Sequence, residues 1–210
     1  MIKQKSLKSD FIQKTLQELV GSLDPFLLFS TDLECLIAIS LSAQTKDLRV
    51  NSVTPTLFSY IKTPEDLVNM DVVLLENIIK PLGFYKRKAF LLKQLGVVLV
   101  KDFSSSVPQS KESLKTLPGV GEKTASVFRS QFYHFPEFPV DTHVQRLAIR
   151  WGLSTHKNPD RISEDLKDFF PKDQWNKISL QMIQFGRNFC LARKKHSCTI
   201  CDFIEGKKDS

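Results

Sequence analysis

The chain has 210 residues, 41% hydrophobic and 25% charged, which excludes a wholly disordered protein and leaves room for one large or two small domains. Lysine and arginine outnumber acidic residues by 30 to 23, and this net charge of +7 suits a polyanionic partner such as nucleic acid. No stretch approaches the roughly 18 apolar residues of a membrane span, and the first residues lack a signal-peptide core. We therefore expect a cytoplasmic, nucleoid-associated protein that binds no membrane.

Apolar residues recur at helical spacing along the chain, and convincing strands with a period of two are absent. The first apolar face lies within residues 11–20, and the almost wholly apolar segment 33–42 is expected to be a buried helix. Further amphipathic helices are expected up to residue 189. Three polar residues stand directly before such segments and are predicted to cap them, namely Asp71, Ser110 and Asn158.

The best internal boundary is YHFPEFPVD, residues 133–141, where Pro136 and Pro139 break the helical pattern. Helix-rich regions lie on both sides of this segment. The sequence therefore predicts an all-α protein with a change of domain near residue 136.

The segment LPGVGEKTASVF, residues 117–128, predicts a tight reversal between two short helices, because its glycines adopt backbone angles that a side chain would obstruct. Backbone amides at the start of the second helix would then point outward together and form an anion site. A GVG turn alone is equally consistent with a structural connection that carries a solvated lysine, Lys123. The residues of the predicted anion site are Gly119, Val120, Gly121 and Thr124.

The string LPGVGEKTA resembles the helix-hairpin-helix element of the endonuclease III family of DNA glycosylases. Three further segments resemble parts of that family, in the family's order, so that the resemblance covers nearly the whole chain. They are LIAISLSAQTKDLRVNSV at 36–53, FPVDTHVQRLAIR at 138–150 and QFGRNFCLARKKHSCTIC at 184–201.

The resemblance implies an all-α protein with two helical domains and a DNA-binding cleft between them. Residues 24–136 would form a helical barrel that contains the helix-hairpin-helix motif at about 110–131. Residues 1–23 and 137–210 would form the second domain, with the C-terminal cysteine loop.

The function that this resemblance implies is DNA repair by a monomeric, bifunctional DNA N-glycosylase and abasic-site lyase. Such an enzyme excises oxidised pyrimidines from damaged double-stranded DNA and then cleaves the strand by β-elimination. The family's nucleophilic lysine falls on Lys123, and an amine can form a Schiff base with the opened sugar, which a hydroxyl cannot. Attack requires the uncharged amine, and a helix N-terminus disfavours the cation.

The family's catalytic aspartate falls on Asp141. The same residue is also a candidate N-cap for the helix that follows, where it would accept hydrogen bonds from the amides of His143 or Val144. Both roles are compatible, because a capping carboxylate stays ionised and can stabilise positive charge on the sugar as the base leaves.

A damaged base inside a duplex must be flipped out, and the gap must be held open. The resemblance assigns Gln44 to the gap and Phe84 to a second wedge. A polar helix-end residue and a packed aromatic ring remain the structural alternatives for these two positions. The basic residues Arg193 and Lys194 are expected to contact phosphates.

The family's [4Fe-4S] cluster is held by four cysteines, and this chain has only Cys190, Cys198 and Cys201 in the corresponding loop. The first gap is also one residue longer than in the family. A cluster with a substitute oxygen ligand, a zinc site completed by His196 and a metal-free loop all remain open. The expected chemistry needs no cofactor.

Two other functions remain open. One is a helix-hairpin-helix glycosylase for another lesion or mismatch, although Lys123 argues against members that use water as the nucleophile. The other is a non-enzymatic DNA-binding module, against which the pairing of Lys123 with Asp141 argues.

Overall fold

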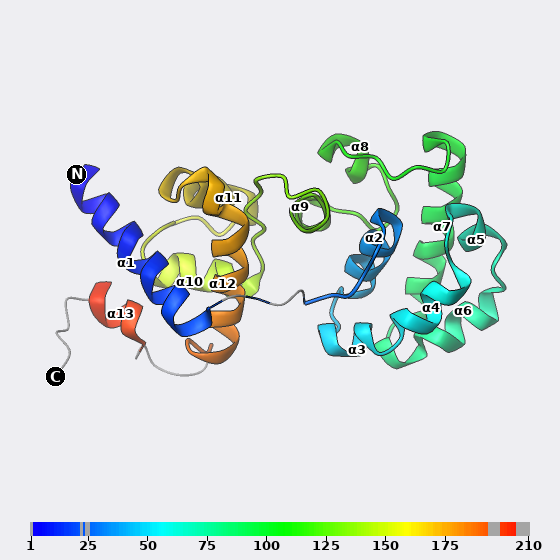
Figure 1. The fold of residues 1–210 in the computed structure, drawn as a ribbon, viewed down its shortest axis with the longest axis horizontal. Helices are drawn as coiled ribbons and strands as arrows, with labels where there is room; N and C mark the ends of the chain where they lie inside the picture. Colours follow the sequence, from blue (N-terminus) through cyan, green and yellow to red (C-terminus); the bar gives the residue numbers. More distant parts are fainter. Residues whose placement is uncertain (1, 22, 24–25, 193–197, 205–210) are drawn as a thin grey trace. The chain divides into compact units, whose positions relative to one another are not determined.

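The computed structural model describes residues 2–21, 23, 26–192 and 198–204, and every regular element in these ranges is a helix (Figure 1). The predicted all-α fold is therefore confirmed for the part of the chain that the structure describes. The helices form two compact units. One comprises Pro25–Phe135 and is called the hairpin unit, and the other comprises Met1–Asp24 with Pro136–Ser210 and is called the terminal unit.

The hairpin unit is built around a short helix that is apolar on all sides. This helix, α2, is buried along most of its length, as its sequence predicts, and it packs against α7 and α9. The helices of this unit are α2 (Asp32–Leu41), α3 (Asp47–Asn51), α4 (Thr54–Tyr60), α5 (Pro64–Asn69), α6 (Val72–Ile79), the 3-10 helix η1 (Lys80–Leu82), α7 (Tyr85–Phe103), α8 (Lys111–Lys115) and α9 (Glu122–Gln131).

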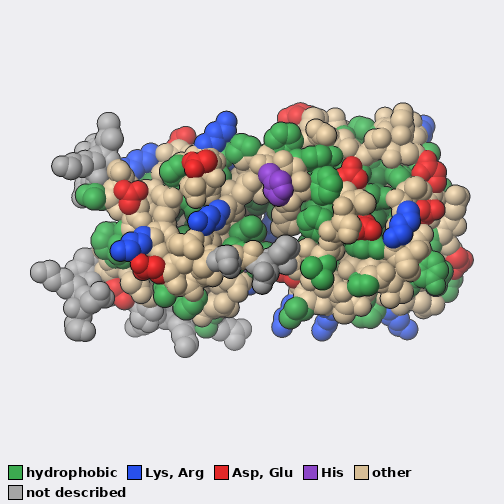
Figure 2. Space-filling view, viewed as in Figure 1, with side chains coloured by type: hydrophobic (Ala, Val, Ile, Leu, Met, Phe, Trp, Pro, Cys, Tyr) green, Lys and Arg blue, Asp and Glu red, His purple; other side chains and the backbone are tan. Residues whose placement is uncertain are grey.

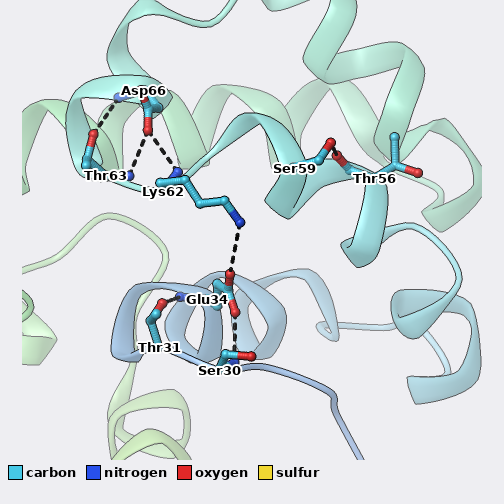
Figure 3. Close-up of polar contacts among 8 residues, drawn as sticks. All are labelled: Ser30, Thr31, Glu34, Thr56, Ser59, Lys62, Thr63 and Asp66. Carbon is cyan, nitrogen blue, oxygen red and sulfur yellow. Dashed lines mark hydrogen bonds and ion pairs between the residues drawn. The ribbon is translucent and has the colours of Figure 1, made fainter.

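The start of α2 is tied to the start of α5 through a buried glutamate (Figure 3). Glu34, with 8% of its surface exposed, accepts a hydrogen bond from the Ser30 amide at 2.7 Å and lies 4.0 Å from the Lys62 ammonium. The backbone amide of Lys62 in turn donates at 2.8 Å to the side chain of Asp66, which also forms the capping box of α5 with Thr63. These contacts position the N-terminus of α2, whose C-terminus leads directly to Gln44.

The terminal unit joins the two ends of the chain. Its first helix contributes Ile12 and Leu16 to the core, and it packs against α12 and α13 from the other end of the sequence (Figure 1). Trp151 and Phe185 pack edge to face at the centre, with ring centroids 5.6 Å apart. The helices are α1 (Ile2–Val20), α10 (Thr142–Arg150), α11 (Pro159–Phe169), the 3-10 helix η2 (Lys172–Gln174), α12 (Trp175–Asn188) and α13 (Thr199–Ile204).

The three predicted helix caps are confirmed. The side chain of Asp71 accepts from the Leu74 amide at 2.8 Å, and the hydroxyl of Ser110 accepts from the Ser113 amide at 3.1 Å. The side chain of Asn158 caps α11 in the same manner. Short-range polar signals in the sequence therefore place these helix starts correctly.

The surface carries both signs of charge. On the face shown in Figure 2, Lys and Arg side chains are interspersed with Asp and Glu over the described residues. Among the helices that the structure describes, none is long and apolar enough to cross a membrane.

Candidate active site

The turn between α8 and α9 has the geometry that its glycines require. Gly119 has a φ of +78°, a left-handed conformation that favours glycine, and the Val120 amide closes the turn by donating to the Leu117 carbonyl at 3.1 Å. Gly121 is the N-cap residue of α9 in an extended conformation, and it offers no side chain to the first-turn amides. The exposed glycines therefore leave the start of α9 open to an approaching anion.

Lys123 lies in the first turn of α9 and is exposed. The neighbouring Glu122 forms ion pairs with Lys111 at 2.5 Å and Lys115 at 2.9 Å, both on α8. Burial alone would raise the pKa of Glu122, but the hydrogen bonds and charges of these two lysines outweigh it and hold the pKa below its ordinary value. The Glu122 carboxylate is therefore engaged with α8.

Asp141 is the N-cap residue of α10, which confirms its predicted structural role. Its Oδ1 atom accepts hydrogen bonds from the amides of both His143 and Val144, each at 2.8 Å. Because both bonds fall on one oxygen, the second carboxylate oxygen of this half-buried residue stays available for another group. Lys123 belongs to the hairpin unit and Asp141 to the terminal unit, so each occupies the N-terminal end of a helix in its own unit.

A pocket of about 420 Å³ in the hairpin unit brings together Gln44, Phe84 and Gly119. Gln44 and Phe84 both have positive φ angles, +56° and +47°, in the left-handed region that residues other than glycine seldom adopt. Phe84 is 70% exposed, which argues against the alternative of a packed aromatic ring. Their role as wedges stays a prediction. The predicted contacts Val120, Gly121 and Thr124 are not among the pocket's lining residues.

Two basic residues that the sequence did not single out also line this pocket, Arg87 and Lys88. Lys88 is only 8% exposed, and its ammonium donates to the Leu41 carbonyl at 2.8 Å and to the Thr45 hydroxyl at 2.6 Å. Burial lowers the pKa of Lys88. The Lys88 side chain thus stabilises the turn that contains Gln44. The only sequence signal was the run of basic residues that follows Phe84.

The three predicted metal ligands converge at one place in the terminal unit. The sulfur atoms of Cys190, Cys198 and Cys201 all lie within 4.8 Å of one another, and the Cys198 thiol donates to the Cys201 sulfur at 3.2 Å. Cys190 and Cys201 are buried, whereas Cys198 is partly exposed. This arrangement provides a donor set for a thiophilic metal ion.

Two arginines of α10 hold the first cysteine and the loop that follows it. Arg150 donates to the Cys190 sulfur at 3.1 Å and to the Leu191 carbonyl at 3.0 Å, and Arg146 donates to the Cys190 carbonyl at 2.9 Å. The pKa of Cys190 is lowered to about 5, first by the hydrogen bond from Cys198 and then by Arg150, against the opposing effect of burial. These arginines, spaced four apart on one helix, were missed by the sequence reasoning.

Three residues named from the sequence lie outside the described residues. They are the predicted phosphate contacts Arg193 and Lys194 and the possible zinc ligand His196.

Comparison with known proteins gives consistent matches over most of the chain. A family model described as HhH-GPD superfamily base excision DNA repair protein matches residues 37–172. Endonuclease III of Bacillus subtilis (strain 168) is 36% identical over 187 residues, which cover 87% of this chain and 85% of the relative.

Two solved structures extend the match to the fold. A non-covalent endonuclease III–DNA complex has a TM-score of 0.86 at 32% identity, covering 93% of this chain and 92% of its own. A trapped endonuclease III–DNA covalent intermediate, an estranged-adenine complex, has a TM-score of 0.85 at 32% identity and covers 91% of both chains. With a family model over more than half of its length and relatives this similar, the chain belongs to the endonuclease III family, within the HhH-GPD superfamily of base excision DNA repair proteins.

Proposed function

We propose that this chain is a bifunctional DNA glycosylase that excises oxidised pyrimidines from duplex DNA and cleaves the strand at the resulting abasic site. The observation that carries the proposal is an exposed lysine amine, Lys123, in the first turn of α9 behind an open glycine turn. The chain's likeness to an endonuclease III trapped covalently on DNA supports a covalent mechanism for this amine.

In the proposed reaction, the uncharged amine of Lys123 attacks the anomeric carbon of the damaged nucleotide, and the base leaves with its bonding electrons. The sugar ring opens to a Schiff base. Loss of a proton from C2′ of this imine then forms a carbon–carbon double bond and expels the 3′ phosphate, which leaves with the electrons of its C–O bond. Asp141, positioned by the hydrogen bonds of two amides, stabilises positive charge on the sugar or accepts the lysine proton. The mechanism requires that both units, as two domains, contact the same nucleotide.

DNA contacts follow from the rest of the site. The open start of α9 would bind a backbone phosphate through the amides of Gly119, Gly121 and Thr124, and Val120, whose amide closes the turn, would hold this loop in place. Gln44 and Phe84, held in left-handed conformations at the edge of one pocket, would fill the space that the flipped base leaves. Arg193 and Lys194 would add phosphate contacts.

No step of this mechanism uses a cofactor, since the nucleophile is an amine and the stabilising group a carboxylate. The loop has three thiolates where a [4Fe-4S] cluster uses four, and we infer that the chain holds no such cluster. The enzyme would act in the cytoplasm on the DNA of the nucleoid.

Borohydride trapping on a duplex that contains thymine glycol tests the proposal. The wild-type protein should form a covalent adduct with the DNA, and Lys123→Ala should form none. The matched control is Lys101→Ala, which removes an exposed lysine of α7 in the same unit and should trap normally. An adduct formed by Lys123→Ala would show that the nucleophile is assigned wrongly, and an adduct formed only on mismatched duplexes would replace the proposed substrate class.

A further inference from the structure

The three-cysteine set joins two segments of the terminal unit. Cys190 follows the C-cap residue of α12, Cys198 directly precedes α13, and Cys201 lies in the first turn of α13. Their sulfur atoms are within 4.8 Å of one another, although seven residues separate the first two cysteines. Three thiols that converge in a largely buried position are suited to bind a soft metal cation.

We propose that this set binds one zinc ion, or another single thiophilic divalent ion, instead of the [4Fe-4S] cluster of the family. Distances between the ligands favour one ion. Thiolates bound to one tetrahedral zinc at about 2.3 Å lie about 3.8 Å apart. The sulfur atoms of Cys198 and Cys201 lie 3.2 Å apart, and no pair of the three sulfur atoms is more than 4.8 Å apart, so the set is compact enough for one ion. In a cubane cluster each thiolate binds a different iron and points away from the centre, so the thiolates must stand farther apart.

The number of ligands leads to the same conclusion. Among the described residues, no fourth histidine, cysteine, aspartate or glutamate joins the three cysteines. These residues supply ligands for only three of the four irons of a [4Fe-4S] cluster, whereas a tetrahedral ion with three thiolates can complete its shell with a water molecule or a small thiol. The site as proposed does not depend on His196.

Charge balance adds an independent argument. Three thiolates and one divalent cation sum to a charge of −1, which is costly to bury without a compensating cation. The Arg150 guanidinium, 3.1 Å from the Cys190 sulfur, supplies one positive charge and an N–H donor to a bound thiolate. Arg150 is itself fixed by the carbonyls of Leu191 and Ala192. The surroundings therefore balance the net charge of one divalent ion bound by three thiolates.

The consequence is structural. Zinc carries out no redox chemistry, and an ion bound to all three cysteines would link the end of α12 to the start of α13. The link would hold α13 against the rest of the terminal unit, where Phe203 stacks on Phe11 of α1 with ring centroids 3.6 Å apart.

Elemental analysis of the full chain tests the inference without reference to enzyme activity. The protein is purified without oxygen from cells supplied with both zinc and iron, and its zinc, iron and acid-labile sulfide are measured. About one zinc per chain with no iron or sulfide is the expected result. Iron and sulfide in stoichiometric amounts would overturn the inference, and so would a chain that retains no metal and binds none when zinc is added alone.

Variants identify the ligands. Cys198→Ser, at the partly exposed position, should lose the zinc, whereas Cys35→Ala should keep it, because Cys35 is buried in α2 of the other unit. Arg150→Met should retain the three ligands but weaken zinc affinity by about 10- to 100-fold in competition with a chelator. Full zinc content and affinity in Cys198→Ser would refute the site. Since Lys123 plays no part in these measurements, their failure would leave the proposed function unaffected.

Discussion

Replacing Asp141 with asparagine separates the two roles of this side chain, the cap of α10 and the proposed stabilisation of charge on the sugar. One oxygen of the native residue accepts two amide hydrogen bonds at 2.8 Å. Asparagine ranks with aspartate as an N-cap and retains an oxygen for both bonds. Asp141→Asn loses only the interaction of the charge with the helix N-terminus, about 0.3–1 kcal/mol. Asp141→Ala loses the cap as well, which costs about 1 kcal/mol more.

The expected results differ between stability and activity. For a chain of this length, about 1 kcal/mol shifts the Tm by about 2–4 °C, so Asp141→Ala should melt measurably below Asp141→Asn. Both variants should lose base excision by about 10²-fold or more, because neither carries the negative charge. Thermal unfolding gives the first quantity, and single-turnover excision of thymine glycol gives the second.

The matched control for the cap is Asn158→Ala. Asn158 caps α11 in the same unit through the Asp160 amide at 2.8 Å, and it has no proposed catalytic role. This variant should lose about 1 kcal/mol of stability and keep the wild-type excision rate. The reasoning is refuted if Asp141→Asn excises at the wild-type rate, or if Asn158→Ala loses as much excision as Asp141→Ala.

Three further substitutions probe the surroundings of the site. Phe84→Ala should keep the free energy of unfolding within about 0.5 kcal/mol of the wild type, because the ring is 70% exposed. It should nevertheless weaken binding to lesion DNA about tenfold or more in a gel-shift titration. Unchanged affinity would refute the wedge role of Phe84. Lys88→Met leaves the buried Leu41 carbonyl without its donor and should lower the free energy of unfolding in urea by about 1–3 kcal/mol, and an unchanged value would contradict a stabilising role for this ammonium. Gly186→Ala would place a Cβ 2.9 Å from the Cβ of His143. The cost of overpacking, about 1–3 kcal/mol, should exceed the gain of about 1 kcal/mol in helix propensity, so the Tm should fall. An unchanged or higher Tm would show that α12 and α10 can separate without cost.

Local signals explain most of what the sequence predicted. The caps at Asp71, Asn158 and Asp141 depend on amides two or three residues away, and the reversal at Gly119 depends on its own φ angle. Short windows of sequence contain all the groups involved. Such features are therefore predictable before the fold is known.

Features that depend on distant contacts were not predicted. Lys88 is buried because its ammonium meets Leu41, which is 47 residues away, and Arg150 contacts Cys190 across 40 residues. The left-handed conformations of Gln44 and Phe84 were also missed, because residues other than glycine seldom adopt them and only tertiary contacts can maintain them.

The same division separates the two proposed catalytic residues from the pocket of the hairpin unit. Lys123 and Asp141 are each positioned by the first turn of one helix, so a short motif specifies where the amine and the carboxylate lie within their own units. The pocket beside Gln44 and Phe84 is instead lined by segments near residues 40–44, 84–95 and 118–119, which only the fold brings together. Substitutions within these lining segments can reshape the pocket without altering either helix start. Under the proposed function, differences in DNA binding between related chains should therefore arise from this lining, where the two proposed wedges lie, while the two helix starts remain the same.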